Sequence, residues 1–229
     1  MKLGLFDSGL GSMVVLEAFQ QEFPELDIIV EMDRKNAPYG DKSSKEIQEL
    51  TLQGVKNLFK RGADVIILAC NTASVHVLRW LQREKFPDKY ILGVMIPGAE
   101  AIVEGGYKKV GILATKATVD VRGYAERVHI LDSSIDIEEI GTVGIVAMIE
   151  NQEIETPQMR EKIRSYIKKF SPDREVLVLG CTHFPLIRSH IESLWEEIHG
   201  KPTPAIIDPG KEAAKKFHGW IKRKGLLIS

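Results

Sequence analysis

The chain has 229 residues, a formal net charge of −1, and 44% hydrophobic and 28% charged residues. This length can bury a substantial core in one large or two small domains, and the composition is that of an ordinary globular protein. The near-zero charge gives no electrostatic reason to expect nucleic acid or a membrane surface as a partner, and no apolar run reaches the roughly 20 residues of a membrane helix.

Apolar runs typical of buried strands alternate with periodic stretches typical of amphipathic helices along the whole chain. This alternation predicts an α/β fold with mostly parallel sheets covered by helices. The predicted strands cover 3–6, 27–32, 64–69, 90–96, 109–114, 135–140, 175–180 and 205–207. The predicted helices cover 12–22, 44–61, 74–84, 157–170, 184–198 and 209–224.

A weak internal similarity divides the chain into two halves. The stretches KLGLFD at 2–7 and KVGILAT at 109–115 both begin a strand and lead into a loop, and each precedes one cysteine. We therefore expect two similar domains, with a boundary near residues 96–98.

Two loops of the first half are candidate binding elements. The glycines of DSGLGS at 7–12 allow close backbone approach, and the Asp7 carboxylate can accept hydrogen bonds from a substrate ammonium. A tight strand–helix turn with a capping acid explains the same residues, and a dinucleotide fingerprint lacks its third glycine, since Val14 stands there. The backbone of PYG at 38–40 can bind a carboxylate, or it forms an ordinary proline turn.

The two cysteines of the chain, Cys70 and Cys181, each follow an apolar strand. Open α/β sheets bind their ligands at this end of the strands, and a following helix N-terminus favours a thiolate. Either cysteine alone fits an inert buried thiol, but the matched pair indicates chemistry. A disulfide is not expected in the cytosol, and a metal site lacks ligand spacing, because only His183 lies close.

Small polar side chains follow both cysteines. Asn71, Thr72 and Thr182, together with free backbone N–H groups, suit an anionic substrate. His183 can polarise a carboxylate or assist the thiol of Cys181.

These residues carry a resemblance to a known family. The chain resembles the glutamate racemases of the aspartate/glutamate racemase superfamily in five stretches, which occur in the family's order across nearly the whole chain. They are FDSGLG at 6–11, PYG at 38–40, ACNTAS at 69–74, GCTHFPL at 180–186 and IID at 206–208.

The resemblance implies two α/β domains with the active site in the cleft between them, residues 1–96 plus 208–229 forming the first and 97–207 the second. It implies that no cofactor is used. Cys70 and Cys181 would be the catalytic acid/bases, assisted by Asp7 and His183. The implied substrate-binding residues are Asp7, Ser8, Pro38, Tyr39, Gly40, Asn71, Thr72, Thr118, Glu150, Thr182 and His183.

Two thiols on opposite faces of an α-carbon account for inversion, because one removes a proton as thiolate while the other returns one. By resemblance Cys70 deprotonates the D-enantiomer and Cys181 the L-enantiomer. The chain departs from the family in four places, one of which is Pro209, where a serine usually follows Asp208. The other three lie earlier in the chain. Ser12 follows Gly11 where a second glycine is usual, the segment 141–150 keeps only its final acid, and the chain is shortened around 124–140.

We expect a cytoplasmic, cofactor-independent glutamate racemase, an isomerase that supplies D-glutamate for peptidoglycan synthesis, and thus for cell-wall biogenesis and cell shape. The expected partner is a small-molecule amino acid, and a homodimer is an option. Three alternatives stay open: another amino acid racemase such as one acting on aspartate, a catalytically weak binding homologue, and a nucleotide-binding protein with Glu31 or Asp33 as its acid.

Overall fold

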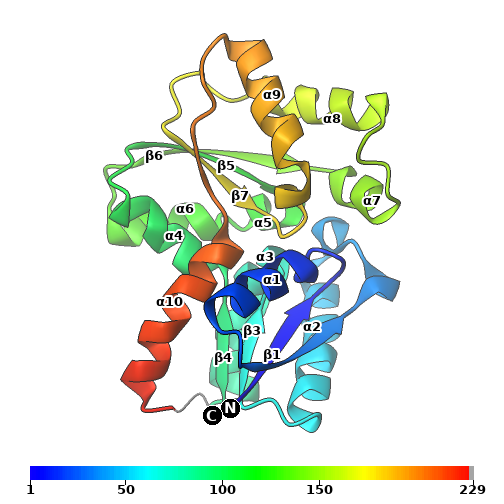
Figure 1. Ribbon diagram of the computed structural model, residues 1–229, viewed down its shortest axis with the longest axis vertical. Helices are drawn as coiled ribbons and strands as arrows, with labels where there is room; N and C mark the ends of the chain where they lie inside the picture. The colour runs from blue at the N-terminus through cyan, green and yellow to red at the C-terminus, as the bar shows by residue number, and fades with distance from the viewer. Residues whose placement is uncertain (227–229) are drawn as a thin grey trace.

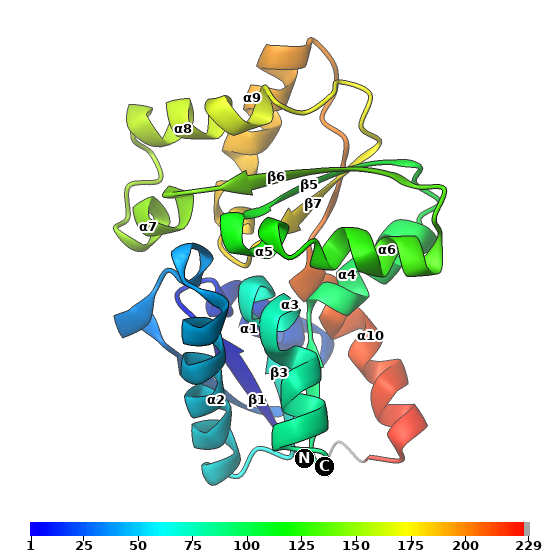
Figure 2. The ribbon, with the colours of Figure 1, turned by 180° about the vertical axis from the view of Figure 1, so that it is seen from behind.

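The computed structural model describes residues 1–226. The chain forms two lobes, each built on a four-stranded parallel sheet that carries helices on its faces (Figures 1 and 2). The predicted α/β fold of two similar sheets is therefore confirmed. Within the described residues no helix combines the length and the apolar character needed to cross a membrane.

The eight strands are β1 (Lys2–Asp7), β2 (Asp27–Met32), β3 (Val65–Leu68), β4 (Tyr90–Gly93), β5 (Lys109–Thr115), β6 (Asp136–Thr142), β7 (Val176–Gly180) and β8 (Ala205–Ile207). The helices are α1 (Ser12–Glu22), α2 (Ser44–Lys60), α3 (Asn71–Trp80), α4 (Met95–Glu104), α5 (Lys116–Asp120), α6 (Gly123–Leu131), α7 (Ile145–Glu150), α8 (Pro157–Ile167), α9 (Arg188–His199) and α10 (Pro209–Lys224). Short helical turns are η1 (Arg34–Asn36), η2 (Tyr39–Asp41), η3 (Leu81–Lys85) and η4 (Phe184–Ile187).

Both sheets have the same strand order. The first runs β2-β1-β3-β4 and the second β6-β5-β7-β8, with every neighbouring pair parallel. In each sheet the first strand of the half lies between the second and the third, so the order reverses beside β1 and β5. Ligands of open parallel sheets bind at the carboxyl ends of strands next to such a reversal. Cys70 follows β3 and Cys181 follows β7, at equivalent places.

The last helix returns to the first sheet. We call the lobe with strands β1–β4 the lower lobe and the one with β5–β8 the upper lobe, as they lie in Figure 1. Three residues of α10, Ala213, Phe217 and Ile221, are buried in one cluster with Leu3 and Val15 of the lower lobe. Figure 1 shows α10 alongside that lobe. The strand before it, β8, pairs instead with β7 of the second sheet. The domain limits themselves stay a prediction.

The predicted strand over residues 90–96 was too long. The strand expected over 90–96 ends at Gly93, and α4 begins at Met95. Pro97 does not prevent this helix, because it lies in the first turn, where backbone N–H groups have no helical partner. The boundary expected near 96–98 therefore lies inside α4. The helices α5, α6 and α7 were not predicted, since each is short.

Candidate active site

Cys70 is the N-cap residue of α3. Its side chain is 5% exposed, and the Ala73 N–H donates to its sulfur over 3.5 Å. The predicted low pKa of this thiol is wrong, because burial raises the pKa of Cys70 to about 12, with a further contribution from the negative charge of Asp7. The N–H of Ala73 and the hydroxyl of Ser8 only partly offset this. The Cys70 thiol is therefore protonated in this state.

Asp7 ends β1 and is fully buried beside Cys70. Its Oδ1 accepts hydrogen bonds from the Gly9 N–H at 3.1 Å and the Ser8 hydroxyl at 3.4 Å, and the Ser8 Oγ lies 3.6 Å from the Cys70 sulfur. Its Oδ2 has no partner among residues 1–226. Burial raises the pKa of Asp7, opposed by the positive charge of His183. An unpartnered buried carboxylate oxygen is a strong acceptor for a substrate cation.

Cys181 lies directly after β7 and is 6% exposed. It does not stand at the start of a long helix, since the next element is the short turn η4. Its sulfur lies 3.8 Å from Nδ1 of His183, whose Nε2 lies 2.6 Å from Oε1 of Glu150. Both cysteines are free thiols.

The buried His183 is positively charged. Burial alone lowers its pKa, but the hydrogen bonds with Cys181 and Glu150 outweigh this and raise the pKa to about 10. The same hydrogen bond to His183 lowers the pKa of Glu150. Glu150 also accepts the Leu10 N–H at 2.7 Å, which joins α7 of the upper lobe to the loop after β1.

The glycines of the first loop let the two lobes touch. A Cβ on Gly9 would lie 2.0 Å from Oε1 of Glu150, and one on Gly11 would lie 2.2 Å from Oγ1 of Thr182. A side chain at either position would therefore displace Glu150 or Thr182 from its present place. The glycines were predicted to allow a close approach of the backbone, and the residues that approach them belong to the second half of the chain.

Three hydroxyls form a triangle at the lobe interface. Thr72 Oγ1 lies 2.9 Å from Thr115 Oγ1 and 3.1 Å from Thr118 Oγ1, and the last two are 2.9 Å apart. Thr72 is the second residue of α3, whereas Thr115 ends β5 and Thr118 lies in α5. Gly40 packs on the same group, since its Cβ would lie 2.6 Å from that of Thr115.

The other expected residues lie in the same region. The Tyr39 hydroxyl donates to Asp33 at 2.7 Å, and the buried Asn71 accepts a hydrogen bond from Tyr124. Pro38 lines a cavity of about 480 Å³ with Arg34 and Glu150 between η1 and α7.

Comparison with known proteins decides the family. The sequence model described as Asp/Glu/Hydantoin racemase matches residues 15–217. The chain belongs to this racemase family. The prediction of an amino acid racemase, an isomerase, is thereby confirmed.

Individual relatives agree over nearly the whole racemase chain. A glutamate racemase of Aquifex aeolicus (strain VF5) is 31% identical over 98% of this chain and 85% of its own. A glutamate racemase structure from Bacillus anthracis superposes with a TM-score of 0.89 at 27% identity, covering 99% of this chain and 84% of that one. The structure of a glutamate racemase from Francisella tularensis in complex with D-glutamate superposes with a TM-score of 0.88 at 28% identity, covering 100% of this chain and 84% of that one.

Sequence reasoning missed Thr115 and Tyr124 of this racemase. A signal for Thr115 was present, because aligning KLGLFD with KVGILAT places Thr115 opposite Ser8. Tyr124 follows no motif, and its position depends on the path of α6.

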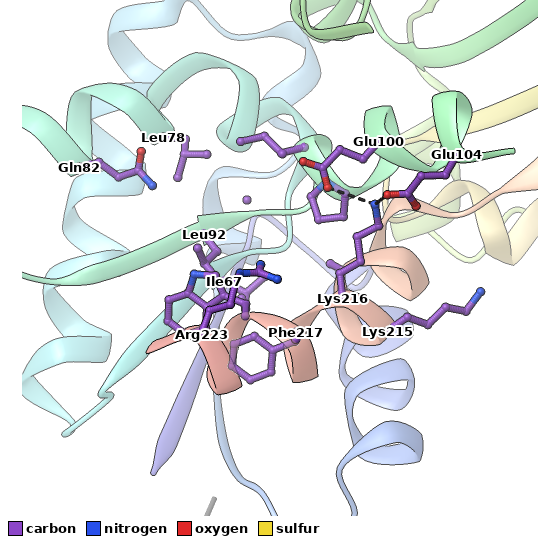
Figure 3. A pocket seen from close by; sticks show the side chains of 16 residues that line it. Ile67, Leu78, Gln82, Leu92, Glu100, Glu104, Lys215, Lys216, Phe217 and Arg223 are labelled. Carbon is purple, nitrogen blue, oxygen red and sulfur yellow. Dashed lines mark hydrogen bonds and ion pairs between the residues drawn. The ribbon is translucent and has the colours of Figure 1, made fainter. Parts of the chain in front are cut away.

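A second cavity of the racemase, about 510 Å³, lies between β4, α4 and α10 (Figure 3). Leu92 and Phe217 contribute to its apolar lining, and Lys216 bridges Glu100 and Glu104 at its edge. None of the expected site residues lines it, so it is separate from the thiols. Within residues 1–226 no group of three or more acidic, His or Cys side chains is arranged to hold a metal ion.

Proposed function

We propose that this racemase interconverts L- and D-glutamate without a cofactor, with Cys70 and Cys181 as the two acid/bases. The observation that carries the proposal is the pair of buried thiols at equivalent strand ends of two like sheets. The charge of Cys181 contributes to the raised pKa of Cys70, so the two thiols act on one another electrostatically. The named relatives, which are glutamate racemases, support the choice of substrate.

The substrate ammonium binds the free Oδ2 of Asp7 in this proposal, beside Ser8. Its carboxylates bind the N–H groups and side chains of Asn71, Thr72 and Thr182, with Thr118 and the Tyr39–Gly40 backbone alongside. Donors held in place in a dry site act more strongly than in water, which helps to stabilise the charge that develops as the α-proton leaves.

One proton leaves and another arrives. In the L-to-D direction the Cys181 thiolate takes the α-proton and the Cys70 thiol donates its proton to the opposite face of the carbanion. The cycle ends with a Cys181 thiol and a Cys70 thiolate, and the D-to-L direction is its reverse. The protonated state of Cys70 supports its role as the first acid, and the imidazolium of His183 complements negative charge on Cys181.

The enclosed geometry supports general acid–base chemistry. A weakly acidic α-proton demands a large reduction of the barrier, about 1.4 kcal/mol for every tenfold in rate. Water excluded by the closed lobes would otherwise quench the carbanion or protonate it from either face.

The biological role in this proposal is the supply of D-glutamate for peptidoglycan synthesis, hence cell-wall formation and cell shape. A cytoplasmic location is consistent with it, since two-thiol catalysis needs cysteines that stay reduced. The substrate is the expected small-molecule partner, and a homodimer is the arrangement to test by sedimentation.

The deciding experiment is circular dichroism of D- or L-glutamate with the purified protein in reducing buffer and without added cofactor. Decay of both signals to zero is the expected result. Decay with aspartate only would retain the chemistry and change the substrate. Absence of any decay, together with tight glutamate binding, would replace catalysis by a binding role.

A further inference from the structure

Tyr124 joins the upper lobe to the residue that follows Cys70. It is the second residue of α6 and is fully buried, and its hydroxyl donates to Asn71 Oδ1 over 2.5 Å. Asn71, itself 2% exposed, is the first residue of α3. A hydrogen bond between two buried side chains from different lobes constrains both.

The backbone before Tyr124 is arranged for this approach. Arg122 has φ 52°, in the left-handed region that non-glycine residues seldom adopt. Gly123 follows, and a Cβ there would lie 2.9 Å from Cγ1 of Val75 on α3. A strained residue and a glycine in close contact together bring the start of α6 against α3, and strain of this kind collects at functional sites.

The direction of the hydrogen bond fixes the orientation of the Asn71 amide. Burial raises the pKa of Tyr124 well above its usual value, reinforced by the negative charge of Asp208, so the phenol keeps its proton. A buried O–H group needs an acceptor, and the amide offers only its oxygen. With the oxygen directed at Tyr124, the amide NH2 group points to the other side of the Asn71 side chain.

We infer that Tyr124 is a positioning residue that holds the Asn71 amide with its NH2 group toward the substrate carboxylate. The inference rests on the proposed function of Asn71 as a carboxylate donor. Tyr124 does not touch the substrate and acts only through Asn71. Without its hydroxyl the amide is free to rotate and to offer an oxygen to an anion, which repels it.

Kinetics of Tyr124→Phe, Asn71→Ala and the double variant test this. We expect Tyr124→Phe to lower kcat/KM for glutamate about tenfold, the usual value of one hydrogen bond to a charged group. Since Tyr124 acts through Asn71, adding Tyr124→Phe to Asn71→Ala should cause no further loss. Tyr166→Phe is the matched control, because its hydroxyl bonds the Val143 backbone instead, and we expect its activity to be unchanged.

Independent losses that add in the double variant, or a Tyr124→Phe enzyme with unchanged kcat/KM, would overturn the inference. If the unaltered protein does not racemise glutamate, the proposed function fails, and a substrate-free readout still decides the positioning role. The NMR signals of the Asn71 side-chain NH2 group should shift in Tyr124→Phe, while those of Asn57, which bonds Glu31, stay in place. Unshifted Asn71 signals would show that Tyr124 does not orient the amide.

Discussion

Cys70 and Cys181 have different neighbours, although each follows the third strand of its sheet. Cys70 has Ser8 at 3.6 Å and the buried Asp7 beyond it, whereas Cys181 has the charged His183 at 3.8 Å. In the proposed mechanism each thiol transfers the proton on one face of the substrate, so removing one sulfur removes one half of the reaction.

We expect Cys70→Ser and Cys181→Ser each to lower kcat by about 10²–10⁴-fold, because a serine hydroxyl is a much weaker acid than a thiol and is not ionised near neutral pH to act as a base. In deuterated buffer the remaining cysteine should still exchange one enantiomer: L-glutamate in Cys70→Ser and D-glutamate in Cys181→Ser. Mass spectrometry of the recovered amino acid measures this. Full racemisation by either variant would exclude the two-thiol mechanism.

His183 predicts a pH-dependent stability. Its folded pKa of about 10 lies above the ordinary 6.5. A raised pKa contributes stability that is complete below pH 6.5 and is lost as the pH rises through 10. We expect the unaltered chain to have a higher free energy of unfolding than His183→Gln at about pH 6. This advantage should be smaller at about pH 10.5, by at least ~1.4 kcal/mol, the equivalent of one pKa unit.

Chemical denaturation at both pH values checks the sign. A difference that grows with rising pH would mean that His183 is neutral when buried. The stability difference between the unaltered chain and Glu150→Gln should also become smaller at high pH, because the Glu150 carboxylate is the partner that stabilises the imidazolium of His183.

At the scale of elements, the sequence was informative wherever a motif ended a strand. The loops after β1, β3 and β7 were expected to lie together. Those after β1 and β3 leave the same edge of the first sheet, whereas the loop after β7 leaves the second sheet and places Thr182 and His183 against Gly11. The similarity of KLGLFD to KVGILAT predicted two similar halves, and the two sheets indeed have the same strand order. Such features depend on local pattern and on the hand of parallel connections.

Other features could not be read from the sequence. The pKa of Cys70 follows from burial and from Asp7, which lies far away in the chain, rather than from the helix that begins at Asn71. The role of Glu150 in bonding Leu10 requires the packing of α7 on the facing lobe. These contacts connect residues widely separated in sequence, and no periodicity records them.

The loop between β1 and α1 predicts a substitution that affects activity more than folding. In Gly11→Ala the new methyl group would collide with the side chains of Thr182 and His183, which must then move. We expect kcat/KM to fall at least about tenfold, since small displacements of catalytic groups are costly, with a smaller change in stability. Gly219→Ala in α10 is the control, because its Cβ would meet only the Arg223 side chain at 3.4 Å. Unchanged kinetics of Gly11→Ala would show that the lobes need not touch at this loop.

The whole molecule encloses its reactive groups. Cys70 and Cys181 are at most 6% exposed, so we expect substrate and thiol reagents to reach them when the lobes separate. Glu150 opposes this separation through its hydrogen bond to Leu10 and its ion pair with Arg34 at 3.8 Å.

We expect the two cysteines of Glu150→Ala to react several-fold faster with a small alkylating reagent. The closed state loses contacts worth about 1–3 kcal/mol, so separating the lobes costs less free energy. Glu155→Ala, on the same lobe but with an 86% exposed side chain, should not change the rate. Mass spectrometry of the modified peptides reports each thiol separately. Equal rates in all three proteins would mean that Glu150 does not hold the lobes together.

Thermodynamics limits how far the different surroundings of the two sulfurs can favour one direction of the reaction. Mirror-image amino acids have identical free energies in water, so the equilibrium constant between them is one whatever the protein does. The ratio kcat/KM must then be equal for the two hands of the substrate. The imidazolium beside one thiol and the hydroxyl beside the other can change KM and kcat for each enantiomer. Any change in kcat must be matched by a change in KM, so that kcat/KM stays equal for the two enantiomers. No substitution in either lobe can make this racemase accumulate one enantiomer; a cell that needs a single hand must remove it in the next step.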